Sequence, residues 1–221
     1  MVYDPALCPV PASPIFDARS YGARASRVSA GGRQAAWFIP LAHGEGVLRH
    51  YQRGGLIARV SKDRYVWQGE EATRAFSECR VMAHLHEAGV SVPAPVAGAY
   101  WRHGLTYRAA IITQRIPDVL PLAHALQPER ARAVAQAVVR MHRAGAWHAD
   151  LNAFNILIDP ADRVWLIDFD KAVLGPMSEA RRLANLSRLA RSLKKLAGSR
   201  GESFAADVQQ HYRLLWQGSS T

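Results

Sequence analysis

The chain has 221 residues, of which 49% are hydrophobic and 21% are charged. This composition is typical of a globular protein with a buried core, and it excludes a disordered or collagen-like chain. Lys and Arg number 28 against 18 Asp and Glu, so the formal net charge is +10 and predicts an anionic partner: nucleic acid, a phosphorylated ligand or an acidic membrane. The two cysteines do not make a disulfide framework, and no signal peptide or membrane-spanning run is evident. We therefore expect a cytoplasmic protein.

The first half of the chain predicts β-strands and a single helix. Its first 20 or so residues are rich in proline and predict an extended appendage. A helix is predicted at 70–88, where apolar residues recur every three or four positions before Gly89. Strands with glycine-rich turns between them are predicted from β-prone runs at 26–28, 35–39, 47–51, 97–101 and 107–116.

The second half predicts mainly helices. One is expected at 128–144 and ends before Gly145, and the other at 178–198 carries a stripe of leucines. The segment 178–200, which includes this helix, holds seven basic residues against one acidic residue, Glu179. That basic face is either solvated or in contact with anionic lipid. The whole layout predicts an α+β fold with a β-rich first half.

The segment 147–171 holds the candidate chemistry. Two apolar runs flank an Asp- and Pro-rich turn and predict an antiparallel hairpin with a four-residue loop at 160–163. In that register Asn155 and Asp168 stand directly opposite each other, with Cβ atoms about 5 Å apart. An amide oxygen and a carboxylate at this spacing predict a Mg²⁺ site that phosphates and water complete. Asp150 lies five residues upstream, where it can face a substrate hydroxyl.

The motif His148-x-Asp150-Leu-x-x-x-Asn155, followed after a hairpin by Asp168-Phe-x, resembles the protein-kinase-like fold. The resemblance implies ATP and Mg²⁺ as cofactors, with Asp150 as the catalytic residue and Asn155 and Asp168 on the metal. His148 is expected to support the loop and not to react. Asp170 replaces the usual glycine, and we interpret it as a helix-cap residue, with metal ligation as the alternative.

The same resemblance implies a two-lobe organisation. Residues 1–22 would be the appendage, 23–117 a β-rich, ATP-binding N-lobe with one helix, and 118–221 a short helical C-lobe. In the N-lobe, the backbone around Gly31 and Gly32 would cover the phosphates. Only about fifty residues follow Asp168-Phe-Asp, which is too few for the peptide-binding helices of a protein kinase and disfavours a protein substrate.

A basic residue on the third strand and a helix glutamate complete this implied nucleotide site. Glu78 is the helix glutamate, and Arg49 stands where kinases usually carry Lys. Arg53 and Lys62 remain alternatives to Arg49 for the phosphate contact. Two residues near the lobe boundary would offer backbone groups to adenine: Gln114 and Ile116.

Within this superfamily the sequence resembles the lipopolysaccharide-sugar kinases, and specifically those that act on 3-deoxy-D-manno-octulosonic acid (Kdo). The stretches that carry the resemblance are 46–55, 73–78, 92–96, 107–117, 148–157 and 185–194. Arg49 is a shared feature of that family. The resemblance implies ATP-dependent phosphorylation of the 4-hydroxyl of Kdo on a lipid A precursor at the cytoplasmic face of the bacterial inner membrane. The implied partners are this anionic sugar-lipid and an anionic membrane surface.

Other functions remain open on the sequence alone. Another small-molecule kinase, such as a heptose or aminoglycoside kinase, would share every catalytic residue. A nucleic-acid-binding module would explain the charge but would leave the Asp and Asn residues of 148–168 without a role, so no nucleic acid is expected. A kinase-shaped scaffold without activity is the third alternative.

Overall fold

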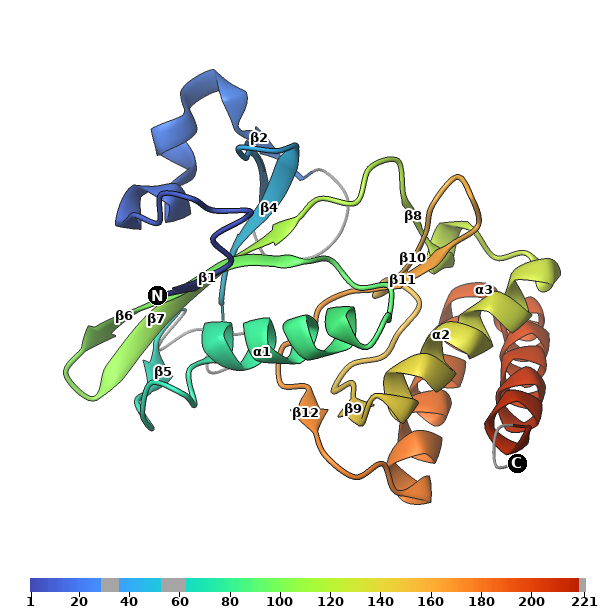
Figure 1. Ribbon diagram of the computed structural model, residues 1–221. Helices are drawn as coiled ribbons and strands as arrows, with labels where there is room; N and C mark the ends of the chain where they lie inside the picture. Colours follow the sequence, from blue (N-terminus) through green and yellow to red (C-terminus); the bar gives the residue numbers. More distant parts are fainter. Residues whose placement is uncertain (29–35, 53–62, 219–221) are drawn as a thin grey trace. The chain divides into compact units, whose positions relative to one another are not determined.

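The computed structural model describes residues 1–28, 36–52 and 63–218 and has a mixed α/β fold (Figure 1). It divides into two compact units, which are described separately below. Unit 1 comprises Met1–Ala83 and Ala94–Arg115, and unit 2 comprises His84–Pro93 and Ile116–Thr221. No helix in the described part of the chain is long and apolar enough to cross a membrane.

Unit 1 is built on an antiparallel sheet whose described strands run in the order β1-β6-β7-β4-β3-β2, with β5 also paired to β7. The strands are β1 (Val2–Tyr3), β2 (Ser26–Arg27), β3 (Ala36–Pro40), β4 (Glu45–His50), β5 (Tyr65–Val66), β6 (Pro95–His103) and β7 (Thr106–Gln114). They confirm the strands expected from the β-prone runs. The glycine turn expected at 30–33 lies outside the described residues.

Residues 1–22 pack on this sheet and do not form the extended appendage that their prolines suggested. Strand β1 pairs with β6 and aligns Val2 with Gly98. Two 3-10 helices, η1 (Ser13–Phe16) and η2 (Ala18–Arg24), follow. Phe16 is 2% exposed, within a core that includes Leu48. Burial of this one aromatic side chain, worth about 1.5–3 kcal/mol, together with a short strand fixes the segment despite its irregular backbone.

Helix α1 (Arg74–Glu87) confirms the helix predicted at 70–88. Within unit 1 it lies close to strand β6, because a Cβ atom on Gly98 would come within 2.9 Å of the Cys79 Sγ atom. Glycine at this position therefore sets the distance between helix and sheet. Burial raises the pKa of the Cys79 thiol to about 12, so this cysteine is an inert core residue.

Unit 2 contains helix α2 (Ala131–Arg143), helix α3 (Glu179–Gln217) and two small antiparallel sheets. One sheet joins β8 (Leu120–Pro121), β10 (Ile156–Ile158) and β11 (Val164–Leu166), and the other joins β9 (Ala146–Trp147) and β12 (Val173–Leu174). Short 3-10 helices, η4 (Leu122–His124) and η5 (Pro128–Arg130), precede α2. Helix α2 buries the apolar face that its sequence predicts: Ala131, Val134, Val138 and Met141.

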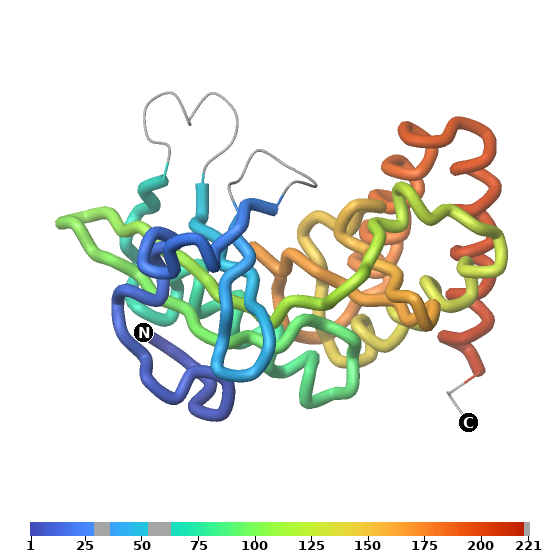
Figure 2. Tube along the Cα trace, turned by 90° about the horizontal axis from the view of Figure 1, so that it is seen from above, coloured from blue at the N-terminus to red at the C-terminus, as the bar shows by residue number. Residues whose placement is uncertain are grey.

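Helix α3 is longer than the helix expected at 178–198, because the chain reverses and continues as a second helix. Gly198 has φ +54° and ψ −130°, which breaks the helix in a conformation that favours glycine. The two halves of α3 then lie side by side (Figures 1 and 2). They approach so closely that a Cβ atom on Gly201 would clash with the Leu193 carbonyl oxygen. The central leucines of the stripe are buried, whereas Leu183 and Leu196 at its ends are exposed.

Candidate active site

Residues 148–155, here called the 148–155 loop, follow strand β9 and precede β10. His148 is fully buried at its base. Its Nδ1 atom accepts from the Asp150 backbone N–H at 3.1 Å, and its Nε2 atom lies 3.0 Å from the Ile167 carbonyl oxygen. These bonds assign a neutral ring with its proton on Nε2. Burial also lowers the pKa of His148, which keeps the ring neutral, and its two hydrogen bonds support the loop.

Asp150 presents its carboxylate at the surface of this loop. Its Oδ1 atom accepts from the Arg188 Nη1 atom at 3.0 Å, and the two side chains are 59% and 46% exposed. Its backbone carbonyl accepts from two amide side chains, those of Asn155 at 2.9 Å and Asn152 at 3.1 Å. The amides hold the loop backbone in place and leave the carboxylate accessible.

The hairpin after the loop forms, but its register differs by one residue from the prediction. Ile156 pairs with Leu166 and Ile158 with Val164, and the connecting loop has three residues, 160–162. Asp162 causes the difference, because its φ of +56° gives the left-handed residue that closes a three-residue hairpin loop.

The register shift changes how the two predicted metal ligands are placed. Asn155 lies opposite Ile167, whose N–H donates to the Asn155 carbonyl at 3.0 Å, so the predicted direct pairing of Asn155 with Asp168 is wrong. Asp168 is the next residue, beyond the end of β11. Its φ of +64° is uncommon for a non-glycine residue and is the kind of backbone strain that gathers at functional sites. Asp170 lies in a turn well before α3, so it does not cap a helix.

The oxygen atoms of Asn155 and Asp168 suit a hard cation such as Mg²⁺. Because Asn155 donates through Nδ2 to the Asp150 carbonyl, its oxygen Oδ1 remains as the ligand atom. No group of three or more His, Cys, Asp or Glu side chains arranged to hold a metal occurs within the described ranges. The residues thus fit a cation held by one or two side chains and completed by phosphate oxygens.

In unit 1 an ion pair joins Arg49 on β4 to Glu78 on α1, the two residues expected to complete the nucleotide site. The Arg49 Nη2 atom lies 2.6 Å from Glu78 Oε1, and Glu78 is 2% exposed. Tyr51 donates its hydroxyl to the other carboxylate oxygen at 2.5 Å, a contact that the sequence analysis missed. Two phosphate-contact alternatives, Arg53 and Lys62, and the predicted glycines Gly31 and Gly32 lie outside the described residues.

The segment expected to contact adenine is where the chain passes from unit 1 to unit 2. The backbone N–H of Gln114 donates to the Ala94 carbonyl, and that of Arg115 donates to the Glu45 carbonyl, each at 2.8 Å. Within the described part of the chain, these bonds leave the N–H of Ile116 as the donor that this segment can offer. Gln114 can contribute its carbonyl or its side chain.

One face of the first half of α3 contacts the 148–155 loop on three successive turns. Asn185 bonds both the N–H and the C=O of His148, at 3.2 and 2.6 Å. Arg188 pairs with Asp150, and the Ser192 hydroxyl accepts from the Ala153 N–H at 3.2 Å. None of these three contacts was predicted from the sequence. The available signal was a polar residue, Asn185, inside a leucine stripe.

Asn185 also belongs to a buried polar network that joins α2 to both halves of α3. His142 on α2 donates from Nε2 to Asn185 Oδ1 at 3.1 Å, and its Nδ1 atom accepts from the Tyr212 hydroxyl at 2.8 Å. Burial lowers the pKa of His142 to about 4. The network is therefore neutral at physiological pH, and it supports the loop through Asn185.

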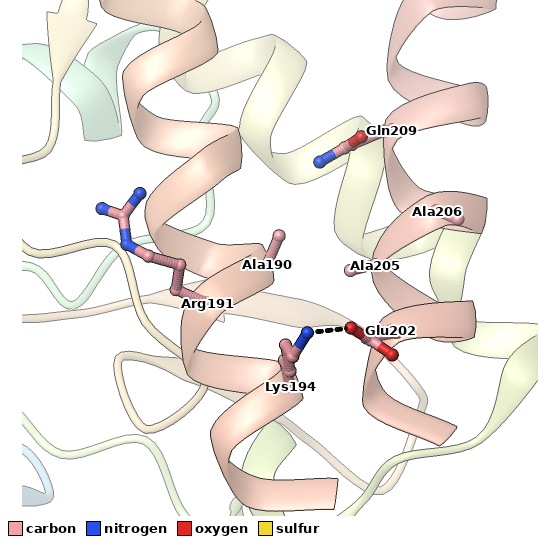
Figure 3. Close-up of a pocket in the computed structure, with 7 residues that line it drawn as sticks. All are labelled: Ala190, Arg191, Lys194, Glu202, Ala205, Ala206 and Gln209. Carbon is pink, nitrogen blue, oxygen red and sulfur yellow. Dashed lines mark ion pairs between the residues drawn. The ribbon is translucent and has the colours of Figure 1, made fainter. Parts of the chain in front are cut away.

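A hollow of about 270 Å³ lies between the two halves of α3, where Lys194 and Glu202 form an ion pair at 2.5 Å (Figure 3). None of the predicted site residues lines it. Its remaining lining residues are Ala190, Arg191, Ala205, Ala206 and Gln209. The candidate chemistry therefore belongs to the 148–155 loop and its neighbours, and this hollow is a gap between packed helices.

Comparison with known proteins shows which protein family the chain resembles. Residues 22–213 match the model of the lipopolysaccharide kinase (Kdo/WaaP) family. The chain is 46% identical to the 3-deoxy-D-manno-octulosonic acid kinase of Xanthomonas axonopodis pv. citri, over 91% of this chain and 84% of that protein. It is 47% identical to the kinase of the same name from Stenotrophomonas maltophilia strain K279a, over 91% and 81% of the two chains.

These matches identify the chain as a kinase, an enzyme that transfers a phosphoryl group. Within that class, the chain belongs to the lipopolysaccharide kinase (Kdo/WaaP) family. Its activity is therefore that of a lipopolysaccharide kinase.

Proposed function

We propose that this enzyme uses ATP and Mg²⁺ to phosphorylate the 4-hydroxyl of Kdo on a Kdo-lipid A precursor. In this proposal unit 1 corresponds to the N-lobe and unit 2 to the C-lobe of a protein-kinase-like fold. The relatives that bear the name of Kdo kinases cover nine tenths of the chain, which favours this acceptor over other sugars.

The observation that carries the proposal is the position of His148. A single buried imidazole bonds the Asp150 backbone on one side and the Ile167 carbonyl, next to Asp168, on the other. It thereby ties the segments of both candidate carboxylates to one rigid group. A structural role for these aspartates in turns alone would not need such a link.

Asp150 accepts a hydrogen bond from the sugar hydroxyl and orients its oxygen toward the γ-phosphorus atom. The bond from this oxygen to phosphorus forms as the bond from phosphorus to the β,γ-bridging oxygen breaks. The hydroxyl proton passes to the Asp150 carboxylate late in this loose transition state. The exposure of Asp150 suits this role, because the acceptor can reach the carboxylate.

The remaining candidate residues hold the nucleotide. Asn155 and Asp168 would bind Mg²⁺, which supplies positive charge to the phosphates during transfer. Arg49, fixed by Glu78, would contact the phosphates of ATP, with backbone amides of Gly31 and Gly32 around them. Gln114 and Ile116 would contact the adenine ring.

Incubation of the purified protein with ATP labelled on the γ-phosphate, Mg²⁺ and Kdo-lipid A precursor tests this function. We expect labelled lipid with wild type, and a loss of kcat of about 10²–10⁴ with Asp150→Ala. Asp168→Asn should abolish transfer, since it removes the charge that binds the cation. NMR of the product identifies the phosphorylated hydroxyl.

Asp118→Asn is the matched control for Asp168→Asn. Asp118 also has a positive φ, +51°, and asparagine tolerates this conformation as well as aspartate does. This control should keep wild-type turnover. An Asp150→Ala protein with wild-type kcat would overturn the catalytic assignment, and a heptose phosphorylated in preference to Kdo would overturn the acceptor.

We also propose that the enzyme works at the cytoplasmic face of the inner membrane, bound peripherally to anionic lipid. The candidate surface is the basic segment 178–200, which comprises the first half of α3 and the two residues after the break at Gly198. Four of its seven basic side chains have contacts inside unit 2: Arg182 with the Trp216 ring, and Arg188, Lys194 and Arg200 with polar groups. The other three remain for lipid: Arg181, Arg191 and Lys195.

Three charges at about 1 kcal/mol each predict weak, salt-sensitive binding to anionic vesicles. Replacing all three with Gln should abolish sedimentation with phosphatidylglycerol vesicles. The matched control is the same change at three exposed arginines elsewhere, Arg132, Arg140 and Arg213. Equal binding of wild type to neutral and anionic vesicles would contradict the idea.

A further inference from the structure

The contact between Arg188 and Asp150 calls for an explanation beyond stability. Of the three residues of α3 that hold the 148–155 loop, Asn185 and Ser192 are uncharged, and only Arg188 carries a charge. Exposed ion pairs contribute little to folding, about 0–1 kcal/mol. The neutral contacts on both sides already fix the loop on the helix. An arginine placed directly on the candidate catalytic carboxylate therefore points to a role in binding.

The guanidinium of Arg188 has further hydrogen-bond donors that the contact with Asp150 does not use. It reaches Asp150 Oδ1 through one nitrogen, Nη1, at 3.0 Å. A guanidinium carries five N–H donors in a planar fork that matches a carboxylate. The side chain is 46% exposed, so an incoming ligand can reach Nη2 and Nε. The second carboxylate oxygen of Asp150, Oδ2, lies outside the contact and can face a hydroxyl.

The proposed acceptor has the chemistry to use these donors. It is a sugar acid, and in its ring form the carbon that bears the carboxylate and the carbon that bears the 4-hydroxyl flank the single deoxygenated carbon 3. A hydroxyl bonded to Asp150 therefore brings the carboxylate of the same sugar close to the group that pairs with Asp150. A neutral sugar would offer no anion at this position.

We propose that Arg188 binds the carboxylate of the acceptor sugar while it remains paired with Asp150, and so selects an acidic sugar over a neutral one. The inference rests on the proposed function, because the carboxylate belongs to the proposed acceptor. Arg188 then acts as a specificity residue whose bonds to substrate align the 4-hydroxyl with Asp150.

The test compares two acceptors with two proteins. The acceptors are the Kdo-lipid A precursor and the same lipid with the Kdo carboxylate converted to the carboxamide, and the proteins are wild type and Arg188→Gln. We expect wild type to lose about tenfold to 100-fold in kcat/KM on the carboxamide, as for one lost charged hydrogen bond. Arg188→Gln should lose a similar factor on the natural acceptor and almost nothing further on the carboxamide.

Controls separate this role from a structural one. Arg213→Gln changes an exposed arginine on the other half of α3 and should behave as wild type with both acceptors. Arg188→Lys should recover part of the discrimination, since it restores the charge but not the fork. ATP affinity should be unchanged in both Arg188 variants. Equal losses by Arg188→Gln on the two acceptors would overturn the proposal, because Arg188 would then act only through Asp150.

A binding measurement distinguishes failure of this inference from failure of the proposed function. Calorimetric titration with free Kdo and with its carboxamide needs no phosphoryl transfer. If wild type binds Kdo more tightly than the carboxamide and Arg188→Gln abolishes this preference, the proposed role of Arg188 is supported. This holds even if wild type transfers no phosphate to the lipid. Binding of free Kdo that is equally strong in wild type and Arg188→Gln would overturn the inference even if the kinase assay succeeds.

Discussion

The ion pairs Arg49–Glu78 and Arg188–Asp150 join the same chemical groups in opposite environments. In unit 1 the two side chains are 18% and 2% exposed and lie 2.6 Å apart, whereas in unit 2 they are 46% and 59% exposed and 3.0 Å apart. Removing one partner of a buried pair leaves an uncompensated charge, but an exposed charge is stabilised by water. The buried pair can therefore act as a fixed support, while the exposed pair can admit a ligand to either partner.

The largest expected effect comes from breaking the buried pair. Glu78→Ala strands the Arg49 charge and should lower the free energy of unfolding by about 3–5 kcal/mol, measured by urea denaturation. Glu45→Ala is the matched control, because Glu45 pairs with Arg115 at the same 2.6 Å distance but is 55% exposed. That control should cost less than about 1 kcal/mol. Similar losses in the two variants would contradict the comparison.

The buried network of His142 should produce the next largest effect, and it depends on pH. The folded-state pKa of His142 is about 4, below its ordinary value of 6.5, so the unfolded chain binds a proton here that the folded chain does not. The stability that depends on neutral His142 is fully present above pH 6.5. It is lost as the pH falls through 4, and the total decrease in the free energy of unfolding is about 3 kcal/mol. The difference between the pH–stability curves of wild type and His142→Gln measures it. Parallel pH–stability curves for wild type and His142→Gln would show that His142 is not the source of this pH dependence.

Tyr51→Phe tests whether the hydroxyl contributes to the buried pair. A hydrogen bond to a charged carboxylate contributes about 1.5–3 kcal/mol, so the unfolding free energy should fall by about 2 kcal/mol. Tyr21→Phe removes a hydroxyl that donates to a neutral carbonyl, that of Ile15 at 2.9 Å, and should cost about 1 kcal/mol. The order of the two losses, read from urea midpoints, is the decisive result.

The smallest stability effect is expected at the exposed pair. Arg188→Gln should change the unfolding free energy by less than about 1 kcal/mol, like the control Arg213→Gln. Its large effect should appear in acceptor kinetics instead. A loss of several kcal/mol in Arg188→Gln would mean that the pair is a structural support, as the buried pair is.

The sequence allowed prediction of the strands of unit 1, helices α1 and α2, and the motif that contains Asp150. It did not allow prediction of contacts between distant segments that have no local pattern. The hairpin register depended on Asp162 adopting a left-handed conformation, which an Asp-Pro-Ala-Asp-Arg turn permits but does not impose. Arg188 was grouped with the other basic residues of its helix, because charge alone does not reveal which carboxylate a side chain meets.

The fold of the 148–155 loop has a consequence for how a helix can hold an irregular segment. Strand β9 pairs with β12 up to Trp147. The next residue is His148, and the side-chain amide of Asn185 bonds both its backbone N–H and its backbone C=O. One carboxamide thus imitates a neighbouring strand for a single peptide position. Aspartate lacks the donor, and leucine lacks both groups. Asn185, a residue of a helix, therefore extends the hydrogen bonding of strand β9 by one residue. The irregular backbone of the loop begins after that residue.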